Sequence, residues 1–317
     1  MSVPASLRVV DFHSHYVGPS WPALPPVNSL PEHVARWVGI AERIANIDAL
    51  MVELDQVDLD RRVLSAPPAL VTPDGVPLAM TSIRAMNDHL AEVVSAHPDR
   101  LVGLATIDAF QGENAAAELE RAVDELGFRG VVIDCARGEL LLDAPEARPF
   151  LVNAAELEIP VFAHPMSPAR LSAELRGLGN WGRALARGTA SSASLFSLIA
   201  SGLFDELRGL RVVFAWLGGG ALPVAGTVPG SECLRRDTPE SERWHVYVDT
   251  MGFEPSAVRY AVDLLGADHV LIGSDWPIGG VPASRERVHA TLSAAGLTTD
   301  QQELVSWTNA ASLLGFS

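Results

Sequence analysis

The chain has 317 residues, of which 48% are hydrophobic and 20% are charged, a globular composition that can bury a large core. Its formal net charge of −16 argues against a nucleic-acid-binding protein, because a basic surface supplies most of the affinity for phosphate backbones. All 23 basic residues are arginine, since the sequence contains no lysine. A Schiff base, a P-loop lysine and a carboxylated lysine that bridges two metals are therefore excluded.

Eight short apolar runs recur along the chain and predict eight β-strands. Most are nearly continuous rather than strictly alternating, which is typical of parallel strands covered on both faces. Between them, stretches such as residues 113–126 and 190–201 predict helices, the second ended by Gly202. The strand candidates are residues 7–12, 62–66, 101–107, 130–134, 160–164, 211–216, 245–249 and 269–274.

This alternation predicts an α/β protein, a single (β/α)8 TIM barrel formed by one domain of residues 1–317. Three connections, residues 16–44, 67–81 and 165–188, are too long for simple links. Each follows a strand, so it belongs at the C-terminal face of the barrel, where TIM barrels bind substrates. Their tryptophans and prolines predict long, ordered lid insertions on that face.

The N-terminal residues and the cysteine content bear on the compartment. The start, MSVPASLRVVDF, lacks the basic and apolar regions of a signal peptide, and Cys135 and Cys233 give no disulfide framework. We therefore expect a cytoplasmic protein. The longest uncharged run, residues 212–231, contains three consecutive glycines and two prolines, so it predicts a strand and a turn rather than a membrane span.

The first strand ends in the sequence Asp11-Phe-His13-Ser-His15. Because side chains in a strand alternate between faces, Asp11, His13 and His15 point to the same side. Two imidazoles two residues apart lie about 7 Å apart at Cβ, close enough to converge on one cation. An isolated HxH motif is more often a pair of unrelated polar residues, so the metal hypothesis depends on further ligands.

Two more strands end in a candidate ligand. His164 ends the run Pro-Val-Phe-Ala-His, and Asp275 ends the run Val-Leu-Ile-Gly-Ser-Asp. A buried carboxylate after apolar residues needs a partner or a metal. His13, His15, His164 and Asp275 form a mixed nitrogen and oxygen set that predicts one divalent metal, with Zn²⁺ as first choice and Mn²⁺ as the alternative. Open positions would remain for water or substrate.

Together these residues resemble the amidohydrolase superfamily, and more closely its branch of proteins similar to aminocarboxymuconate-semialdehyde decarboxylase, the amidohydrolase-2 family. The resemblance covers nearly the whole chain. It implies a TIM barrel, a mononuclear metal centre, a small-molecule carboxylate substrate and a homodimer. The missing lysine agrees with a mononuclear centre, because dinuclear relatives often bridge their metals through one. Besides the ligand motifs, the similar segments are residues 87–100, 128–132, 198–205, 218–223, 247–250 and 309–315.

The sequence departs from the family at the sixth strand. There the family normally has an acid/base histidine before two glycines, whereas this chain has Trp216 before Leu-Gly-Gly-Gly. An indole does not titrate, so neither Trp216 nor Leu217 can transfer a proton at neutral pH. An arginine that family decarboxylases use to hold a substrate carboxylate is also unmatched, in residues 224–228.

Three functions remain open at this point. The first is a metal-dependent decarboxylase, a non-oxidative C–C lyase for a small unsaturated or aromatic carboxylic acid, in which Asp275 or metal-bound water handles the proton. The second is a metal-dependent hydrolase of an amide, lactone or C–C bond, with Asp275 as the base. The third is a metal-binding barrel that has lost catalysis. The four retained ligands favour an enzyme, and the resemblance favours the decarboxylase.

Further residues are candidates for the surroundings of the metal. Asp11 could orient a ligand imidazole or form an ordinary buried hydrogen bond. Arg137, just after the fourth strand, could anchor a substrate carboxylate or remain a solvated loop charge. A group of aromatic residues could line a mouth suited to a flat ligand, or simply pack under the lid. These are Tyr16, Trp181, Trp216 and Trp276.

Overall fold

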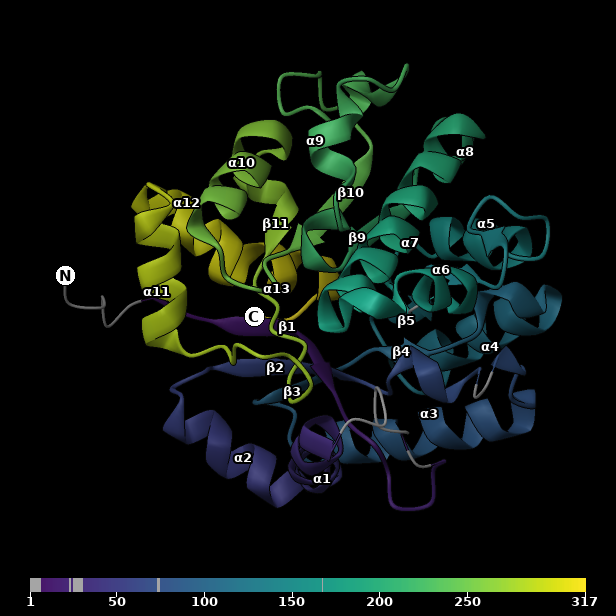
Figure 1. The fold of residues 1–317 in the computed structure, drawn as a ribbon, viewed down its shortest axis with the longest axis vertical. Helices are drawn as coiled ribbons and strands as arrows, with labels where there is room; N and C mark the ends of the chain where they lie inside the picture. The colour runs from purple at the N-terminus through teal and green to yellow at the C-terminus, as the bar shows by residue number, and fades with distance from the viewer. Residues whose placement is uncertain (1–6, 23, 25–30, 73–74, 167) are drawn as a thin grey trace.

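The computed structural model describes residues 7–22, 24, 31–72, 75–166 and 168–317. Parallel strands form a central barrel, and helices surround it (Figure 1). The barrel strands follow one another in chain order around two hydrogen-bonded sheets, β1-β2-β3 and β4-β5-β8-β9-β10-β11. They are β1 (Val10–His15), β2 (Arg61–Ser65), β3 (Leu101–Gly103), β4 (Ala105–Thr106), β5 (Val131–Asp134), β8 (Pro160–His164), β9 (Arg211–Phe214), β10 (His245–Asp249) and β11 (Val270–Leu271).

The predicted (β/α)8 barrel is confirmed, with shifts at the ends of some strands. The predicted third strand is β3 and β4 in succession, separated by Leu104. The ring closes between the first and last strands, where the backbone N–H of Phe12 donates to the carbonyl of Ile272 at 2.8 Å. A parallel bridge between Ser14 and Trp276 continues this closure toward the C-terminal ends of the strands.

The helices begin and end at residues with capping character. Asn46 accepts a hydrogen bond from the backbone N–H of Ala49 at the start of α2, and Thr298 and Gln301 form a capping box at α12. The helices are α1 (Pro31–Ile44), α2 (Ile47–Gln56), α3 (Met80–Ser95), α4 (Glu113–Asp124), α5 (Arg148–Glu156), α6 (Ala169–Glu174), α7 (Asn180–Ala200), α8 (Leu203–Glu206), α9 (Ala221–Ala225), α10 (Pro255–Leu265), α11 (Arg285–Ala294), α12 (Thr299–Glu303) and α13 (Asn309–Leu314).

Two of the three long connections contain helices that the sequence did not reveal. α1 lies in the first, and α6 with the first turns of α7 lies in the third. The helix predicted over residues 190–201 therefore starts ten residues earlier, at Asn180, and it ends before Gly202 as predicted, with Gly202 at a φ of 74°. β6 (Ala136–Arg137) and β7 (Leu140–Leu141) form a small antiparallel hairpin outside the barrel. A lid function for the long connections stays a prediction.

The two larger of three buried hydrophobic clusters in the described part of the chain form the core of the barrel. The larger one packs the outward side chains of the strands against the surrounding helices. The smaller one fills the inside of the barrel and is closed by C-terminal residues, among them Trp307, Ala310 and Leu314. The helix that carries Ala310 and Leu314 therefore blocks the end at which the strands begin, and the opposite end is left for a site. Among the described helices, none qualifies as a membrane-spanning segment.

Candidate metal centre

Four side chains meet at the C-terminal end of the barrel. His13 and His15 come from β1, His164 ends β8, and Asp275 follows β11. All four are buried, and their potential ligand atoms lie within 4.8 Å of one another. Asp275 Oδ1 lies 3.1 Å from His15 Nε2, 3.5 Å from His13 Nε2 and 3.9 Å from His164 Nε2. The structure therefore brings together the four residues that the sequence singled out.

This four-residue cluster contains polar atoms without hydrogen bonds. His13 Nε2, His15 Nε2 and Asp275 Oδ1 are buried and have no partner of good hydrogen-bond geometry in the described part of the chain. An unsatisfied buried polar atom destabilises a fold by about 1–3 kcal/mol. One divalent cation could satisfy all three atoms, and histidine nitrogens with a carboxylate oxygen suit Zn²⁺ or Mn²⁺. The residues present therefore fit a single divalent metal.

The protonation states of the cluster also suit a cation. Burial lowers the pKa of His15 and holds the pKa of His164 well below its ordinary value, so both rings are neutral at neutral pH. Burial alone would raise the pKa of Asp275, but His15 and His164 hold it well below the usual range. Neutral imidazoles and an ionised carboxylate are the forms that bind metals.

Asp249, at the end of β10, orients His13, and the sequence analysis missed it. Its Oδ2 lies 2.7 Å from His13 Nδ1, and its Oδ1 accepts backbone N–H groups from Trp216 at 2.7 Å and Met251 at 2.9 Å. The His13 ring therefore donates through Nδ1 and turns Nε2 toward the cluster. Burial alone would lower the pKa of His13, but the nearby charge of Asp249 raises it above its ordinary value. Asp249 could have been found from the sequence, because it is a carboxylate at the end of a predicted strand, as Asp275 is.

Gly273 permits this close approach. An added Cβ at this position would lie 2.8 Å from the Cβ atoms of both His13 and Asp249, closer than side chains tolerate. The second histidine of β1 is held differently, since His15 Nδ1 lies 3.2 Å from the hydroxyl of Ser65 on β2. Each of the two β1 imidazoles thus has a hydrogen-bonding group behind it and a bare nitrogen in front.

Asp11 lies behind the cluster but forms no hydrogen bond to an imidazole ring among the described residues. Its carboxylate accepts hydrogen bonds from the backbone N–H of His13 at 3.3 Å and from Ser274, at 3.0 Å from the backbone and 2.6 Å from the hydroxyl. Arg62 Nε lies 3.6 Å away. Asp11 therefore ties β1 to the segment after β11, and the imidazole partner that was expected in Asp11 is Asp249.

The structure does not bring Tyr16 or Trp276 to the cluster. The hydroxyl of Tyr16 lies 3.2 Å from His89 Nε2 on α3, because the residue after His15 faces the outside of the barrel. Trp276 is 2% exposed, and its indole N–H donates to Glu53 on α2 at 2.6 Å. Both rings pack against helices around the barrel, and each also lines a cavity that the four cluster residues do not line.

The other two aromatic candidates lie near the mouth. Trp181, at the start of α7, is 79% exposed and lies on the surface. Trp216 is partly buried, directly after β9 and Ala215, and it and Leu217 have φ angles of 56° and 54°. Positive φ at two bulky residues is unfavourable, and such strain gathers at functional sites. The position of the missing histidine is thus a strained turn held by Asp249.

Arg137 is used within the fold. Its Nη1 donates to Asp108 Oδ2 at 2.9 Å, its Nη2 donates to the carbonyl of Phe110 at 2.9 Å, and its guanidinium lies over the Phe110 ring. These contacts leave little of the guanidinium for a substrate, so the structure gives no support to the expected anchor. Asp134, at the end of β5, was also missed, and burial raises its pKa to about 7. In the barrel register it lies opposite His164.

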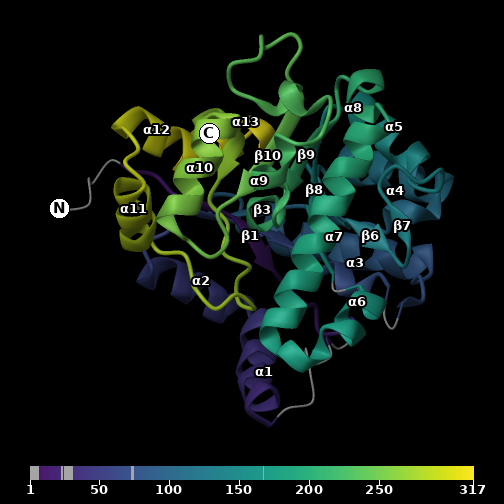
Figure 2. The same ribbon diagram turned by 45° about the horizontal axis from the view of Figure 1, so that its top comes forward.

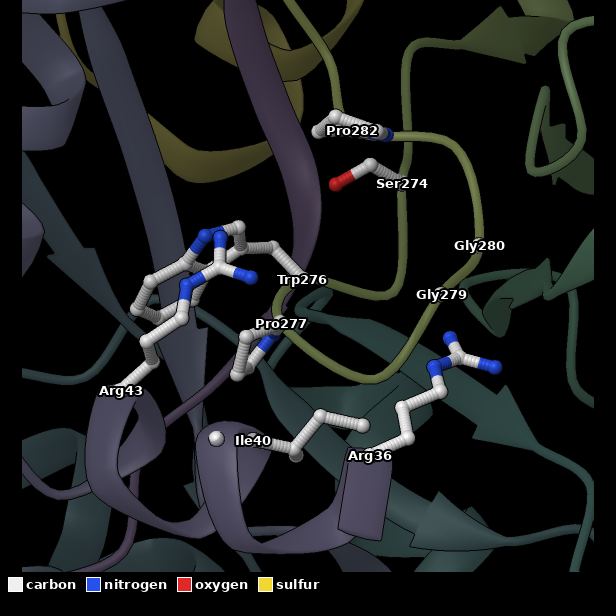
Figure 3. A pocket seen from close by; sticks show the side chains of 10 residues that line it. Arg36, Ile40, Arg43, Ser274, Trp276, Pro277, Gly279, Gly280 and Pro282 are labelled. Atoms are coloured by element: carbon white, nitrogen blue, oxygen red, sulfur yellow. The ribbon is translucent and has the colours of Figure 1, made fainter. Parts of the chain in front are cut away.

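A cavity of about 310 Å³ lies between α1 and the segment after β11 (Figure 3). Arg36 and Arg43 reach it from α1, where the Arg43 guanidinium lies over the Trp276 ring, and Ser274, Gly279 and Gly280 line the opposite side. The four cluster residues do not line it, so it flanks the cluster rather than containing it. Arg36 stands at its edge, where Nη2 donates to the carbonyl of Ile278 at 2.9 Å.

Fold and site together define a barrel protein with a buried histidine and carboxylate cluster at its C-terminal face. The model of the Amidohydrolase family (Amidohydro_2) matches residues 10–316. This chain therefore belongs to that family.

Curated relatives cover most of the chain. A gamma-resorcylate decarboxylase from Rhodococcus jostii is 28% identical over 301 residues, which are 87% of this chain and 90% of the relative. A 2-amino-3-carboxymuconate-6-semialdehyde decarboxylase from Dictyostelium discoideum is 28% identical over 294 residues, 84% of this chain and 81% of the relative. A solved dihydroxybenzoic acid decarboxylase from a Polaromonas species, with bound manganese and the inhibitor 2-nitroresorcinol, superposes with a TM-score of 0.81 at 23% identity, covering 97% of both chains.

Proposed function

We propose that this protein is a metal-dependent decarboxylase, a non-oxidative C–C lyase that removes CO2 from a small unsaturated or aromatic carboxylic acid. The observation that carries the proposal is the buried cluster of His13, His15, His164 and Asp275 at the C-terminal end of an amidohydrolase-family barrel. Relatives that cover most of the chain are decarboxylases, which favours C–C cleavage over amide or lactone hydrolysis.

His13, His15, His164 and Asp275 would hold the metal. When bound, a divalent ion supplies positive charge that orients a substrate carboxylate and withdraws electrons from the breaking bond. The ligand set suits Zn²⁺, our first choice from the sequence, and equally Mn²⁺, which the Polaromonas relative binds. Metal analysis of protein purified without added metal decides between them.

In the proposed reaction the bond between the substrate carbon and its carboxylate breaks and CO2 leaves. The electron pair stays on the substrate carbon, which then takes up one proton. Trp216 cannot supply that proton, because an indole N–H does not titrate. We assign the transfer to Asp275, whose ionised carboxylate would take up a proton from solvent and pass it to the substrate carbon, which returns Asp275 to its ionised form. Asp249 fixes the His13 ring beside it.

We further propose that residues 1–317 act as one domain, that the protein is a cytoplasmic homodimer, and that the long connections cover bound substrate. The family match over residues 10–316 supports the first point. The dimer rests on the family resemblance alone. Light scattering on the purified protein tests it, with twice the chain mass expected.

A product assay tests the reaction. Metal-loaded protein is incubated with aromatic and muconate-like carboxylates, and CO2 release is measured together with amide-, ester- and lactone-hydrolysis products. We expect stoichiometric CO2 and the decarboxylated acid from at least one substrate. Hydrolysis products without CO2 would replace the lyase with a hydrolase. Metal-dependent ligand binding with no turnover across the panel would support a barrel without catalysis.

Trp216→His tests the departure at the sixth strand. The variant introduces a titrating ring where family members have one, and general acid–base catalysis is worth about 100- to 10,000-fold when well placed. Because the new imidazole is not tuned to the site, we expect a gain of about 10-fold in decarboxylation or hydrolysis. Trp216→Phe is the control that changes ring size without adding a titrating group. Equal rates for the two variants would show that this position does not take part in proton transfer.

A further inference from the structure

Arg187 is hydrogen-bonded to the segment that follows His164, next to the metal-ligand cluster in the chain. It lies in the second turn of α7, and its Nε donates to the carbonyl of Pro165, the residue after His164, at 2.8 Å. Its positive charge contributes to the lowered pKa values of His15 and His164. Arg187 is thus anchored by one nitrogen at the rim of the site.

Arg183 lies one turn earlier on the same face of α7. Its Nη1 is buried and has no hydrogen-bond partner in the described part of the chain. The first turns of α7 lie next to α1 (Figure 2), so Arg36 of α1 also approaches Arg183. Arg183 is partly exposed as a residue, but its Nη1 is shielded from solvent and unpaired, which is unusual because buried N–H groups normally find a carboxylate or a carbonyl.

The first turns of α7 are held in this position by close backbone packing. The backbones of Gly188 and Gly219 approach so closely that a Cβ at Gly219 would lie 2.4 Å from the carbonyl oxygen of Gly188. Ser192 adds a hydrogen bond of 3.2 Å to the carbonyl of Gly218. The arginine-bearing face of α7 is therefore fixed relative to the turn that follows β9, at the mouth of the barrel.

The positive charges at this mouth lack matching carboxylates. Among the described residues, Arg36, Arg183 and Arg187 form no ion pair within 4.0 Å, although the chain as a whole is strongly acidic. Burial and the charges of Arg187 and Arg36 lower the pKa of Arg183, and Asp275 opposes this. Once Asp275 is a metal ligand, its charge is shared with the cation, and the mouth becomes more positive.

We propose that Arg183 and Arg187 form a carboxylate-binding subsite beside the metal cluster, which selects substrates that carry a second anionic group. This inference rests on the proposed function and specifies the substrate class as dicarboxylic acids. The carboxylate that is lost lies at the metal cluster, and the second carboxylate accepts hydrogen bonds from the two guanidinium groups. Arginine is suited to this task, because its planar fork matches a carboxylate.

The test measures binding, so it does not depend on turnover. Manganese-loaded protein is titrated with isophthalate and with benzoate in a calorimeter. We expect isophthalate to bind at least about 10-fold more tightly than benzoate. We expect Arg183→Gln to weaken isophthalate binding by about 10- to 100-fold, the loss for a charge-assisted hydrogen bond, and to change benzoate binding by less than about 2-fold. Arg183→Lys keeps the positive charge but loses the planar guanidinium, so its affinity for isophthalate should lie between those of the unmodified protein and Arg183→Gln.

Arg176→Gln is the matched control, since Arg176 is exposed near the start of α7 and donates to the carbonyl of Ala173. It should bind both acids as the unmodified protein does. Equal affinity of the unmodified protein for both acids would overturn the subsite, and so would an Arg183→Gln variant that binds isophthalate normally. A preference for isophthalate that depends on Arg183, with no CO2 release from any substrate, would overturn the decarboxylase and leave the subsite standing.

Discussion

Buried histidines occur at both ends of the barrel, but they differ in whether their ring nitrogens have hydrogen-bond partners. At the end where the strands begin, His269 Nδ1 lies 2.7 Å from the carbonyl of Val246, and its ring stacks on Tyr247 at 4.5 Å. At the opposite end, Nε2 of His13 and of His15 have no hydrogen-bond partner in the described residues. Because buried polar groups are normally paired, a satisfied histidine indicates structure and an unsatisfied one indicates a ligand.

The surroundings of the two ends differ in the same way. The end at which the strands begin is closed by apolar packing of Trp307 and Leu314, and Asn309 donates to the carbonyls of Ala267 and Val270 at 2.8 Å each. The opposite end combines strained backbone at Trp216 with uncompensated arginines. Stability is therefore built into one end of the barrel and chemistry is expected at the other, as in other TIM barrels.

The largest effect is expected from removing a ligand at the polar end. Asp275→Asn replaces an ionised ligand with a neutral amide, so metal content should fall to less than about one tenth per chain and activity by about 1,000-fold or more. Metal analysis and a CO2 assay measure the two effects. Thermal unfolding should show an apoprotein less stable than the unmodified apoprotein, because the neutral amide loses the attraction of the neighbouring histidines that holds the pKa of Asp275 low. Full metal content in this variant would show that Asp275 is not a metal ligand and that the unpaired polar atoms at this end do not indicate a metal site.

A smaller effect is expected from the group that orients His13. Asp249→Asn keeps an oxygen for the backbone N–H groups of Trp216 and Met251 but weakens the acceptor for His13 Nδ1. Such partners behind a ligand histidine affect metal affinity by about 10- to 100-fold. Competition with a calibrated chelator measures this change. Unaltered affinity would show that Asp249 supports the fold and not the metal.

The smallest effect belongs to His269 at the opposite end. Burial lowers its pKa from 6.5 to about 4, with Arg243, Asp268 and His245 as the charged neighbours. Between pH 6.5 and pH 4, His269 binds a proton in the unfolded chain but not in the folded chain. The free energy of unfolding is therefore unaffected by His269 above pH 6.5 and decreases as the pH falls below it. We expect His269 alone to reduce the free energy of unfolding by about 2 kcal/mol at pH 5 relative to pH 8.

His269→Asn removes this titration, and its amide can still donate toward Val246. Denaturant unfolding of apoprotein at pH 8 and pH 5 compares the two proteins. The variant should lose less stability than the unmodified protein over this interval. An identical loss in both would place the pH dependence elsewhere in the molecule.

The barrel and the four-residue cluster were predictable, because strand positions follow from apolar runs and polar residues at strand ends share one face of a barrel. Alternation along β1 also predicted that His13 and His15 point to the same side of the strand. Because side chains alternate along a strand, the same pattern places Tyr16 on the opposite side from His15. The aromatic character of Tyr16 had suggested a pocket residue, and this prediction did not take the alternation into account. Trp276 follows Asp275 but packs on Glu53, a partner about 220 residues away in sequence that no local pattern reveals.

The parts that were missed depend on contacts between distant segments. Asp249 could be noticed as a strand-end carboxylate, but its pairing with His13 depends on the space left by Gly273 across the barrel. Arg183 and Arg187 lie in a segment expected to be a loop, and only its helical conformation puts them on one face, a turn apart. Hydrophobic periodicity predicts neither the pairing of Asp249 with His13 nor the placement of Arg183 and Arg187 on one face of a helix.

The position of a bound metal tests the proposed four-residue site most directly. Crystals of protein loaded with Mn²⁺ are measured above and below the manganese absorption edge, and an anomalous difference map is calculated. We expect one strong peak per chain among His13, His15, His164 and Asp275, about 2.0–2.3 Å from the ligand atoms. No peak among these four residues, or a full-occupancy peak elsewhere in the chain, would contradict the proposed site.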